Sequence, residues 1–354
     1  MGGIILITIR MMAGDEVKPA LKLARKAFAG IECLFISKPK TGIVALIDNQ
    51  IVGGVFVKQI SIQNGSLGYL DTVFVDPACQ GQGIGRQLVA AASDYLLQQG
   101  CQVLSGIVKD DNVGSWQSFL DSGYKRVSLK EAAYHLGMDG MLKQYFVTPL
   151  FACNGMELYL NVKTAPLDAK KVHSLPQIIA YLSLNAVLML AAYFNHQPFN
   201  LFLCIYLLLL AGGVLFGWLG SCLTKREWYF RLNSGGAVLV AFINFVGGLY
   251  PMIGSWYPKQ YENTPAFRKA MGITALCEWC FYLAITLLAF LMANQASIFK
   301  LTASLGSVFL LYRIIAVYPF ESYGGKRVYQ WHKAVFLLMA GLSLGLILMV
   351  NRLL

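Results

Sequence analysis

A glycine-rich segment that follows an apolar, β-branched run is the stretch of this sequence best suited to chemistry. It reads Val75-Asp76-Pro77-Ala78-Cys79-Gln80-Gly81-Gln82-Gly83-Ile84-Gly85-Arg86, and a helical pattern follows it. Glycines let backbone N–H groups approach a ligand closely, and a helix N-terminus adds unpaired donors and the positive end of the helix dipole. The segment therefore predicts a phosphate site between a strand over Gly68–Val75 and a helix over Gly85–Gln98.

Two common phosphate-binding motifs do not fit this segment. The dinucleotide fingerprint needs an acidic residue about 20 residues further on, at the end of the next strand, and the P-loop needs Gly-Lys-Ser/Thr. Neither follows Gly85 in this chain. A tight turn with no ligand is the alternative interpretation of the loop.

This segment and a second motif further along the chain together resemble the motifs of a known family. Gln80-x-x-Gly83-x-Gly85 resembles motif A, Gln/Arg-x-x-Gly-x-Gly/Ala, of the GNAT N-acetyltransferase superfamily. Further on, Asn112 with a small residue three positions later, an aromatic residue seven later and then Gly123-Tyr124 resembles the family's motif B. The resemblance covers about residues 4–161. It implies an α/β GNAT fold, in which a mixed central sheet is flanked by helices.

The resemblance also implies a reaction and a set of site residues. The co-substrate would be acetyl-CoA and the acceptor an amine, and no metal is expected. Asp71 stands where many members carry a glutamate base, although it could equally be a strand-edge charge. Phe119 stands where the family usually has a tyrosine acid, which weakens the expected mechanism but not the CoA site. The implied CoA-binding residues are Phe74, Val75, Gln80, Gly81, Gln82, Gly83, Ile84, Gly85, Arg86, Asn112 and Ser115.

The elements that must position these residues occupy only the first half of the chain. Of 354 residues, 56% are hydrophobic and 13% are charged, whereas charged residues make up about a quarter of soluble domains. Residues 1–165 hold 15 Lys+Arg and 13 Asp+Glu, a net charge of +2, and residues 166–354 hold 14 and 5, a net charge of +9. This composition excludes disorder and a single soluble protein. Basic loops beside a bilayer explain the total of +11 better than nucleic acid does.

The chain thus divides into a GNAT domain over 1–163, a basic linker over 164–174 and an all-α polytopic membrane domain over 175–354. Strands are expected at Ile4–Arg10, Ile43–Ile47, Ile51–Ile60 and Gln102–Val108, with helices at Glu16–Phe28 and Val113–Ser122 and a last strand at Met156–Leu160. Six apolar segments have spanning length: Leu175–Phe194, Phe199–Leu223, Ser234–Trp256, Met271–Ala293, Ile298–Phe320 and Ala334–Val350.

Loop charge favours five spans plus a re-entrant segment over six spans. If Ser234–Trp256 crosses, the basic loops 257–270 and 321–333 both fall outside, against the positive-inside rule. If it enters and leaves on one face, every basic loop is cytoplasmic. The prediction is an integral protein of the cytoplasmic (inner) membrane, with the N-terminal domain in the cytoplasm.

Two ionisable residues lie inside expected spans. Glu278 and Arg313 are each seven residues from the same end of two consecutive antiparallel spans, which predicts an ion pair at matching depth. The alternative places each side chain in a separate wet pocket.

The membrane half has a resemblance of its own. Ala316–Lys326 resembles the Asn-x-x-Pro-x-x-x-Leu-Asp-Gly motif of the site-two protease family of intramembrane zinc proteases. Here the motif Asn is Ala316 and the motif Asp is Gly324, and the stretch nearest to His-Glu-x-x-His, Arg226–Phe230, has neither histidine. The missing ligands argue against a protease. Two hypotheses remain: a membrane-anchored N-acetyltransferase acting on an unknown amine, and an acetyl-CoA-binding sensor coupled to an inactive protease-like domain.

Overall fold

A computed structural model describes residues 6–28, 30–63, 65–109, 112–147, 156–163, 173–193, 198–233, 236–259, 262, 264–317 and 320–353. The chain divides into two compact units: one of Met1–Ala152 and Met156–Lys170, and a second that contains Lys171–Leu354. Most of the predicted linker, 164–172, lies outside the described residues.

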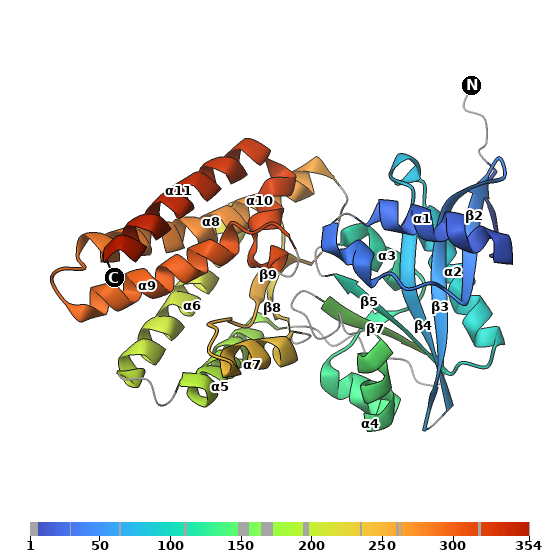
Figure 1. Cartoon of the computed structure of the whole chain (residues 1–354), viewed down its shortest axis with the longest axis horizontal. Helices are drawn as coiled ribbons and strands as arrows, with labels where there is room; N and C mark the ends of the chain where they lie inside the picture. Colours follow the sequence, from blue (N-terminus) through green and yellow to red (C-terminus); the bar gives the residue numbers. More distant parts are fainter. Residues whose placement is uncertain are drawn as a thin grey trace. The chain divides into compact units, whose positions relative to one another are not determined.

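A seven-stranded mixed sheet in the order β1-β2-β3-β4-β5-β7-β6 forms the centre of the first unit (Figure 1). Its strands are antiparallel except for the β4–β5 pair, which is parallel. The strands are β1 (Thr8–Met11), β2 (Thr41–Ile47), β3 (Gln50–Ile62), β4 (Gly65–Val75), β5 (Val103–Lys109), β6 (Lys125–Arg126) and β7 (Met156–Val162). Asp48 and Asn49 form the hairpin turn between β2 and β3, at φ of 48° and 60°, a region that Asp and Asn tolerate.

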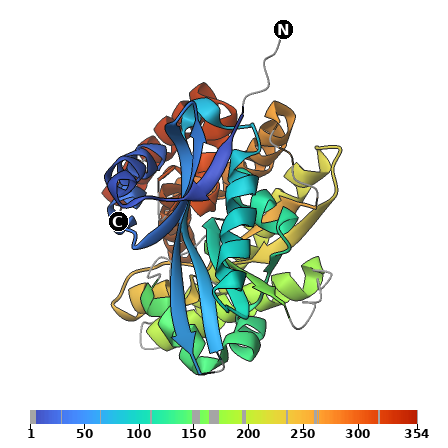
Figure 2. The same ribbon diagram turned by 90° about the vertical axis from the view of Figure 1, so that its right-hand side faces the viewer.

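Helices cover both faces of this sheet, as the alternation of its strands requires (Figure 2). Ile43 and Val55 face α2 (Ile84–Gln98) and α3 (Val113–Asp121), whereas Val44 and Phe56 face α1 (Val17–Ala27). Near the other end, β3, β4 and β7 pack on α4 (Leu129–Val147), whose helical backbone is broken at Gly137.

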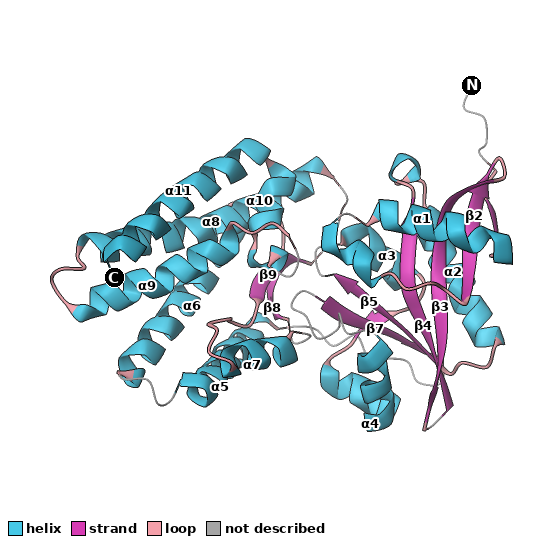
Figure 3. Cartoon of the chain, in the orientation of Figure 1, coloured by secondary structure: helices cyan, strands magenta, loops and turns pink. Residues whose placement is uncertain are grey.

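Helices and one short strand pair make up the described part of the second unit (Figure 3). They are α5 (Ser174–Tyr193), α6 (Phe199–Cys222), β8 (Trp228–Leu232), α7 (Ala237–Phe245), β9 (Gly254–Pro258), α8 (Pro265–Leu291), α9 (Ser297–Arg313), a 3₁₀ turn η5 (Glu321–Tyr323), α10 (Gly325–Trp331) and α11 (Lys333–Leu353). Among the described residues, three helices are long and apolar enough to cross a membrane: Phe199–Cys222, Pro265–Leu291 and Lys333–Arg352. Three such helices are consistent with a membrane domain; the five-span topology stays a prediction.

The apolar segment Ser234–Trp256 does not form one long helix. It contains the nine-residue α7, an irregular stretch and the start of β9. Strands β8 and β9 pair antiparallel, with Leu232 opposite Gly254, so the segment leaves and returns at the same place. A nine-residue helix extends about 14 Å, less than half of a bilayer core.

Side chains satisfy the irregular backbone of this segment. Asn244 donates to the Tyr250 carbonyl at 2.7 Å and accepts from the Tyr250 N–H at 2.8 Å. Asn185 of α5 accepts from the Met252 N–H at 2.9 Å, and the Tyr323 hydroxyl donates to the Pro251 carbonyl at 2.7 Å. Non-helical backbone at membrane depth is tolerated only where it is buried in protein in this way.

Candidate functional site

Strands β4 and β5 separate in the middle of the sheet. Leu67–Leu70 pair with Val103–Gly106, but beyond Leu70 only β3 pairs with β4, while β5 goes on to pair with β7. At the same point β4 has one extra residue: Phe56 lies opposite Thr72 and Val57 opposite Leu70, so Asp71 has no partner on β3. Asp71 is therefore a bulge residue at the fork, and bulges often re-aim a side chain next to a functional site.

Beyond the bulge, β4 presents backbone groups to the fork. Val75 lies opposite Gly53, and the Asp76 N–H donates to the Val52 carbonyl at 2.8 Å. In an antiparallel ladder this makes Val75–Gly53 a non-hydrogen-bonded pair, so the N–H and C=O of Val75, and of Val73 two residues earlier, point away from β3. They point to the side where β5 has left the ladder.

Phe74 differs from its neighbours in this respect. The ladder directs its backbone toward Gly54 of β3, and its side chain is 3% exposed and packs on the Phe56 ring at 5.1 Å between centroids. Of the strand residues that the sequence analysis assigned to CoA, Val75 faces the fork and Phe74 does not. The backbone of Val73, a residue outside the implied set, faces the fork together with that of Val75.

The glycine loop leads from this strand to the start of α2. Gly81 and Gly83 have φ of 83° and 76°, which L side chains rarely adopt, and a Cβ at either position would meet open space. Gly83 is the N-cap of α2, and no side chain caps the helix. The first N–H groups of α2, from Ile84 onward, therefore have neither an intrahelical nor a capping partner.

Other predicted residues surround this helix start. Gly85 has an ordinary backbone conformation, and a Cβ there would lie 3.7 Å from the Ser118 Oγ, so packing alone does not require glycine. The Gln80 side chain donates to the Val75 carbonyl at 3.3 Å, and Gln82 is exposed. The exposed Arg86 forms an ion pair with Asp121 of α3 at 3.5 Å.

Asn112 has a local structural role in addition to any contact with a ligand. It is the N-cap of α3, and its side-chain oxygen accepts from the Ser115 N–H at 3.3 Å. The sequence pair Asn112 and Ser115 is thus a capping pair, which by itself accounts for their spacing of three.

The Asp71 carboxylate is partly buried, with 13% of its side chain exposed. Burial raises the pKa of this carboxyl, while the Lys58 ammonium at 3.1 Å and a hydrogen bond from Ser37 pull its pKa down. The net effect is a raised pKa, which suits a group that must accept a proton.

Part of the first unit matches a known protein family in sequence. Residues 13–124 match the sequence profile of the Acetyltransferase (GNAT) family. These residues form a GNAT acetyltransferase domain. The matched region contains the fork, the glycine loop and both sequence motifs, and the chain therefore carries an N-acetyltransferase domain whose co-substrate is acetyl-CoA.

Solved structures similar to the chain are also acetyltransferases. They include the N-acetylglutamate synthase of Neisseria gonorrhoeae with CoA and N-acetyl-glutamate (16% identity, 45% of this chain and 36% of that one, TM-score 0.33). The ribosomal-protein-S18-alanine N-acetyltransferase of Escherichia coli (12%, 47% and 100%, 0.32) and the GNAT family protein YhbS of Escherichia coli with CoA (18%, 45% and 83%, 0.32) are two more. No curated protein matches the chain.

Phe119 belongs to the core of the GNAT domain. It is 2% exposed, and its ring packs over Gly106, where a Cβ would meet it at 2.2 Å, and against Tyr124 at 4.9 Å. Tyr124 itself is buried and its hydroxyl bonds to Ser93 at 2.9 Å, while burial raises the pKa of that hydroxyl. Neither ring offers an acid that a substrate could reach.

Phe119→Tyr is therefore expected to destabilise the domain without raising acetyl transfer. A hydroxyl added to a ring that is 2% exposed loses its hydration, which costs about 1–3 kcal/mol when no partner replaces the water. Chemical denaturation measures the loss, and initial rates of thiol release measure activity. A faster variant would show that position 119 reaches the reacting groups.

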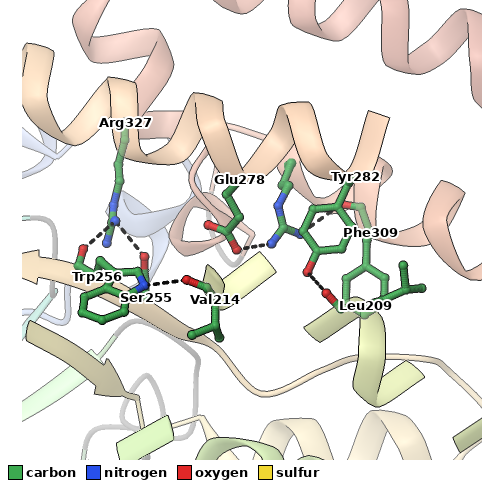
Figure 4. A network of polar contacts seen from close by, with 9 residues as sticks. Leu209, Val214, Ser255, Trp256, Glu278, Tyr282, Phe309 and Arg327 are labelled. Atoms are coloured by element: carbon green, nitrogen blue, oxygen red, sulfur yellow. Dashed lines mark hydrogen bonds and ion pairs between the residues drawn. The ribbon is translucent and has the colours of Figure 1, made fainter. Parts of the chain in front are cut away.

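The second unit contains the Glu278–Arg313 pair, with the Arg313 guanidinium donating to the Glu278 carboxylate (Figure 4). Arg313 is 6% exposed and lies 3.9 Å from the centroid of the Tyr282 ring, whose hydroxyl donates to the Leu209 carbonyl at 3.0 Å. The pair thus joins α8 to α9 and, through Tyr282, to α6.

Glu278→Gln is expected to lower the free energy of unfolding by about 3–5 kcal/mol, because it leaves a buried guanidinium without a counter-charge. The double variant Glu278→Gln/Arg313→Gln is expected to recover much of that loss. Unfolding of the detergent-solubilised chain measures both. Strictly additive losses would mean that the two side chains do not interact energetically.

Residues of the protease-like motif are only partly described, since Tyr318 and Pro319 lie outside the described residues. Glu321 and Tyr323 are buried, and Gly324 has a φ of 101°. No group of three or more His, Cys, Asp or Glu side chains in the described part of the chain could hold a metal ion. The protease resemblance stays a prediction.

Proposed function

We propose that this chain is a membrane-anchored, acetyl-CoA-dependent N-acetyltransferase that acts on an amine from the cytoplasmic side. The observation that carries the proposal is the fork between β4 and β5, which opens toward the uncapped start of α2. A strand edge whose backbone N–H and C=O groups face outward suits an extended, amide-bearing arm, and a helix N-terminus suits a pyrophosphate. The Val75 carbonyl on this edge also accepts from the Gln80 side chain. The two features are joined by the eight residues Asp76–Gly83 inside one domain.

Different residues of the fork and the glycine loop would bind different parts of acetyl-CoA. Backbone N–H groups from Gln80 to Arg86 would hold the pyrophosphate, and the Arg86 guanidinium would add positive charge beside it. The N–H and C=O of Val73 and Val75 would bind the arm of CoA. One of these N–H groups would polarise the thioester carbonyl, an interaction that gains strength as negative charge develops on the oxygen.

Asp71 would act as the base. It lies at the fork, its pKa is raised by burial, and it would take a proton from the amine as nitrogen attacks the carbonyl carbon and the carbon–sulfur bond breaks. Phe119 cannot protonate the leaving thiolate, so water would do so. A thiolate is a stable enough anion to leave without an acid in contact, because thiols ionise near pH 8–9.

A sensor is the second candidate, favoured by the buried Phe119 in place of a tyrosine acid. In that case acetyl-CoA would bind without chemistry, and the membrane domain would respond to it. The two functions differ in whether the protein transfers the acetyl group to an amine: the enzyme does so, and the sensor only binds acetyl-CoA.

The test uses the full-length chain in detergent or nanodiscs, with thiol release followed in the presence of acetyl-CoA and a panel of amines. The panel contains a free peptide N-terminus, a lysine side chain, a polyamine and an aminophospholipid. Release that depends on one amine and on Asp71 supports the enzyme. Saturable binding of acetyl-CoA with no release for any amine contradicts it and favours the sensor.

A further inference from the structure

A cavity of about 710 Å³ in the second unit lies where α6 ends and α8 begins. Its volume falls in the range of about 300–1,000 Å³ that ligand sites occupy. It is lined by charged and apolar side chains, all of which belong to the second unit.

Close packing of α6 on α8 forms one end of this cavity. A Cβ at Gly220 would lie 2.9 Å from Thr274 Cα and from Cys277 Cβ, and one at Gly212 would meet the Phe281 ring. The helices are antiparallel, because the contacts move to higher residue numbers along α6 as they move to lower residue numbers along α8. The end of α6 and the start of α8 are therefore on the same side of any bilayer that the two helices cross.

The charges that line the cavity leave an excess of cations. Arg226 pairs with Glu262 at 2.9 Å, and Lys259 pairs with Glu227 at 3.0 Å. Lys225 and Lys269 have no carboxylate within ion-pair distance among the described residues. The cavity wall thus carries two uncompensated positive charges, one at the end of each helix.

Apolar side chains line the same cavity beside these charges. Leu223 follows the last residue of α6, and Ala266, Ala270 and Ile273 belong to α8. A ligand that matches this wall has an anionic group for the lysines and an apolar part for the helix surfaces. Free phosphate meets only the first requirement, and a neutral lipid meets only the second.

We infer that this cavity binds the phosphate headgroup of an anionic phospholipid, held by Lys225 and Lys269 with its acyl chains against α6 and α8. Basic pockets between spanning helices on the cytoplasmic side suit such headgroups. The inference goes beyond acetyl transfer and requires only that α6 and α8 lie in a bilayer.

The test titrates the full-length protein in mild detergent with three probes: short-chain phosphatidylglycerol, phosphatidylcholine with the same chains, and inorganic phosphate. Phosphatidylglycerol is expected to bind at least tenfold more tightly than either of the others. Equal affinity for the two lipids would exclude a headgroup site, and equal affinity for phosphate would mean a free-anion site rather than a lipid site.

Matched variants then locate the bound lipid. Lys225→Gln/Lys269→Gln is expected to weaken phosphatidylglycerol binding by about 30-fold, since each lysine near a lipid phosphate contributes about a factor of five. Arg268→Gln removes an exposed charge next to Lys269 that does not line the cavity, and is expected to leave affinity unchanged. An equal loss in both variants would mean diffuse surface attraction and would overturn the inference. An unchanged unfolding midpoint of the detergent-solubilised protein in each variant shows that the second unit is folded.

Discussion

Replacing Gly83 by aspartate is expected to weaken acetyl-CoA binding to the full-length protein by about a hundredfold or more, which corresponds to about 2.7 kcal/mol. Gly83 is the N-cap of α2, and no side chain contacts the N–H groups that follow it. An aspartate there would accept from these N–H groups, as capping residues do, and would repel a pyrophosphate at the same place. Titration calorimetry measures the loss.

Gly100 supplies a matched control for this variant. It follows the other end of α2, at a φ of 83° against 76° for Gly83, and a Cβ at either position would meet no atom within 4 Å. Gly100→Asp therefore introduces the same charge and the same backbone strain away from the loop. It is expected to leave acetyl-CoA affinity unchanged, and an equal loss of affinity in both variants would place the pyrophosphate elsewhere.

Asp71→Asn is expected to reduce kcat by about 10²–10⁴-fold, the usual range for a lost general base, with little change in acetyl-CoA affinity. The amide has the size of the carboxylate but cannot take a proton. Steady-state kinetics with the amine that gives thiol release measures kcat, and calorimetry measures binding. An unchanged kcat would mean that Asp71 is not the base and only forms an ion pair with Lys58.

The pH profile gives an independent test of the same residue. A base must be ionised to act, so activity falls as the pH drops through the pKa of Asp71, which burial raises above the ordinary value. The Lys58 ammonium at 3.1 Å lowers that pKa. Lys58→Met is therefore expected to move the acid limb of the profile to higher pH. A limb that stays in place, or moves to lower pH, would mean that another group controls it.

Local patterns in the sequence predict much of the GNAT domain. The loop from Gln80 to Gly85, the hairpin at Asp48-Asn49 and α2 each depend on residues close together in the chain, such as glycines at positive φ and helical periodicity. The β4 bulge does not depend on nearby residues. It arises because Asp71 has no pairing partner on β3, whose facing residues lie about 15 positions earlier in the chain. The pairing with β3 therefore decides that the backbone of Val73, and not that of Phe74, faces the fork, and the local sequence does not reveal this.

In the membrane half, too, some elements can be predicted from nearby residues, whereas others depend on residues that are distant in the sequence. Apolar length alone predicts α6 and α8, while Ser234–Trp256 has spanning length yet forms a short helix and a strand. Its shape depends on distant partners: β8 on one side, and Asn185 and Tyr323 that bond its backbone. Loop charge predicted that its ends lie on one face, but not the hairpin that holds them together.

Hydrogen–deuterium exchange of the full-length chain, with and without acetyl-CoA, locates the CoA site on the backbone. We expect slower exchange in two segments: the β4 edge at Val73–Val75 and the loop and helix start at Gln80–Arg86. The edge of β1, at Thr8–Met11, is expected to exchange equally in both states. Protection confined to other parts of the chain, or no protection at saturating acetyl-CoA, would contradict a CoA site built from the fork and the start of α2.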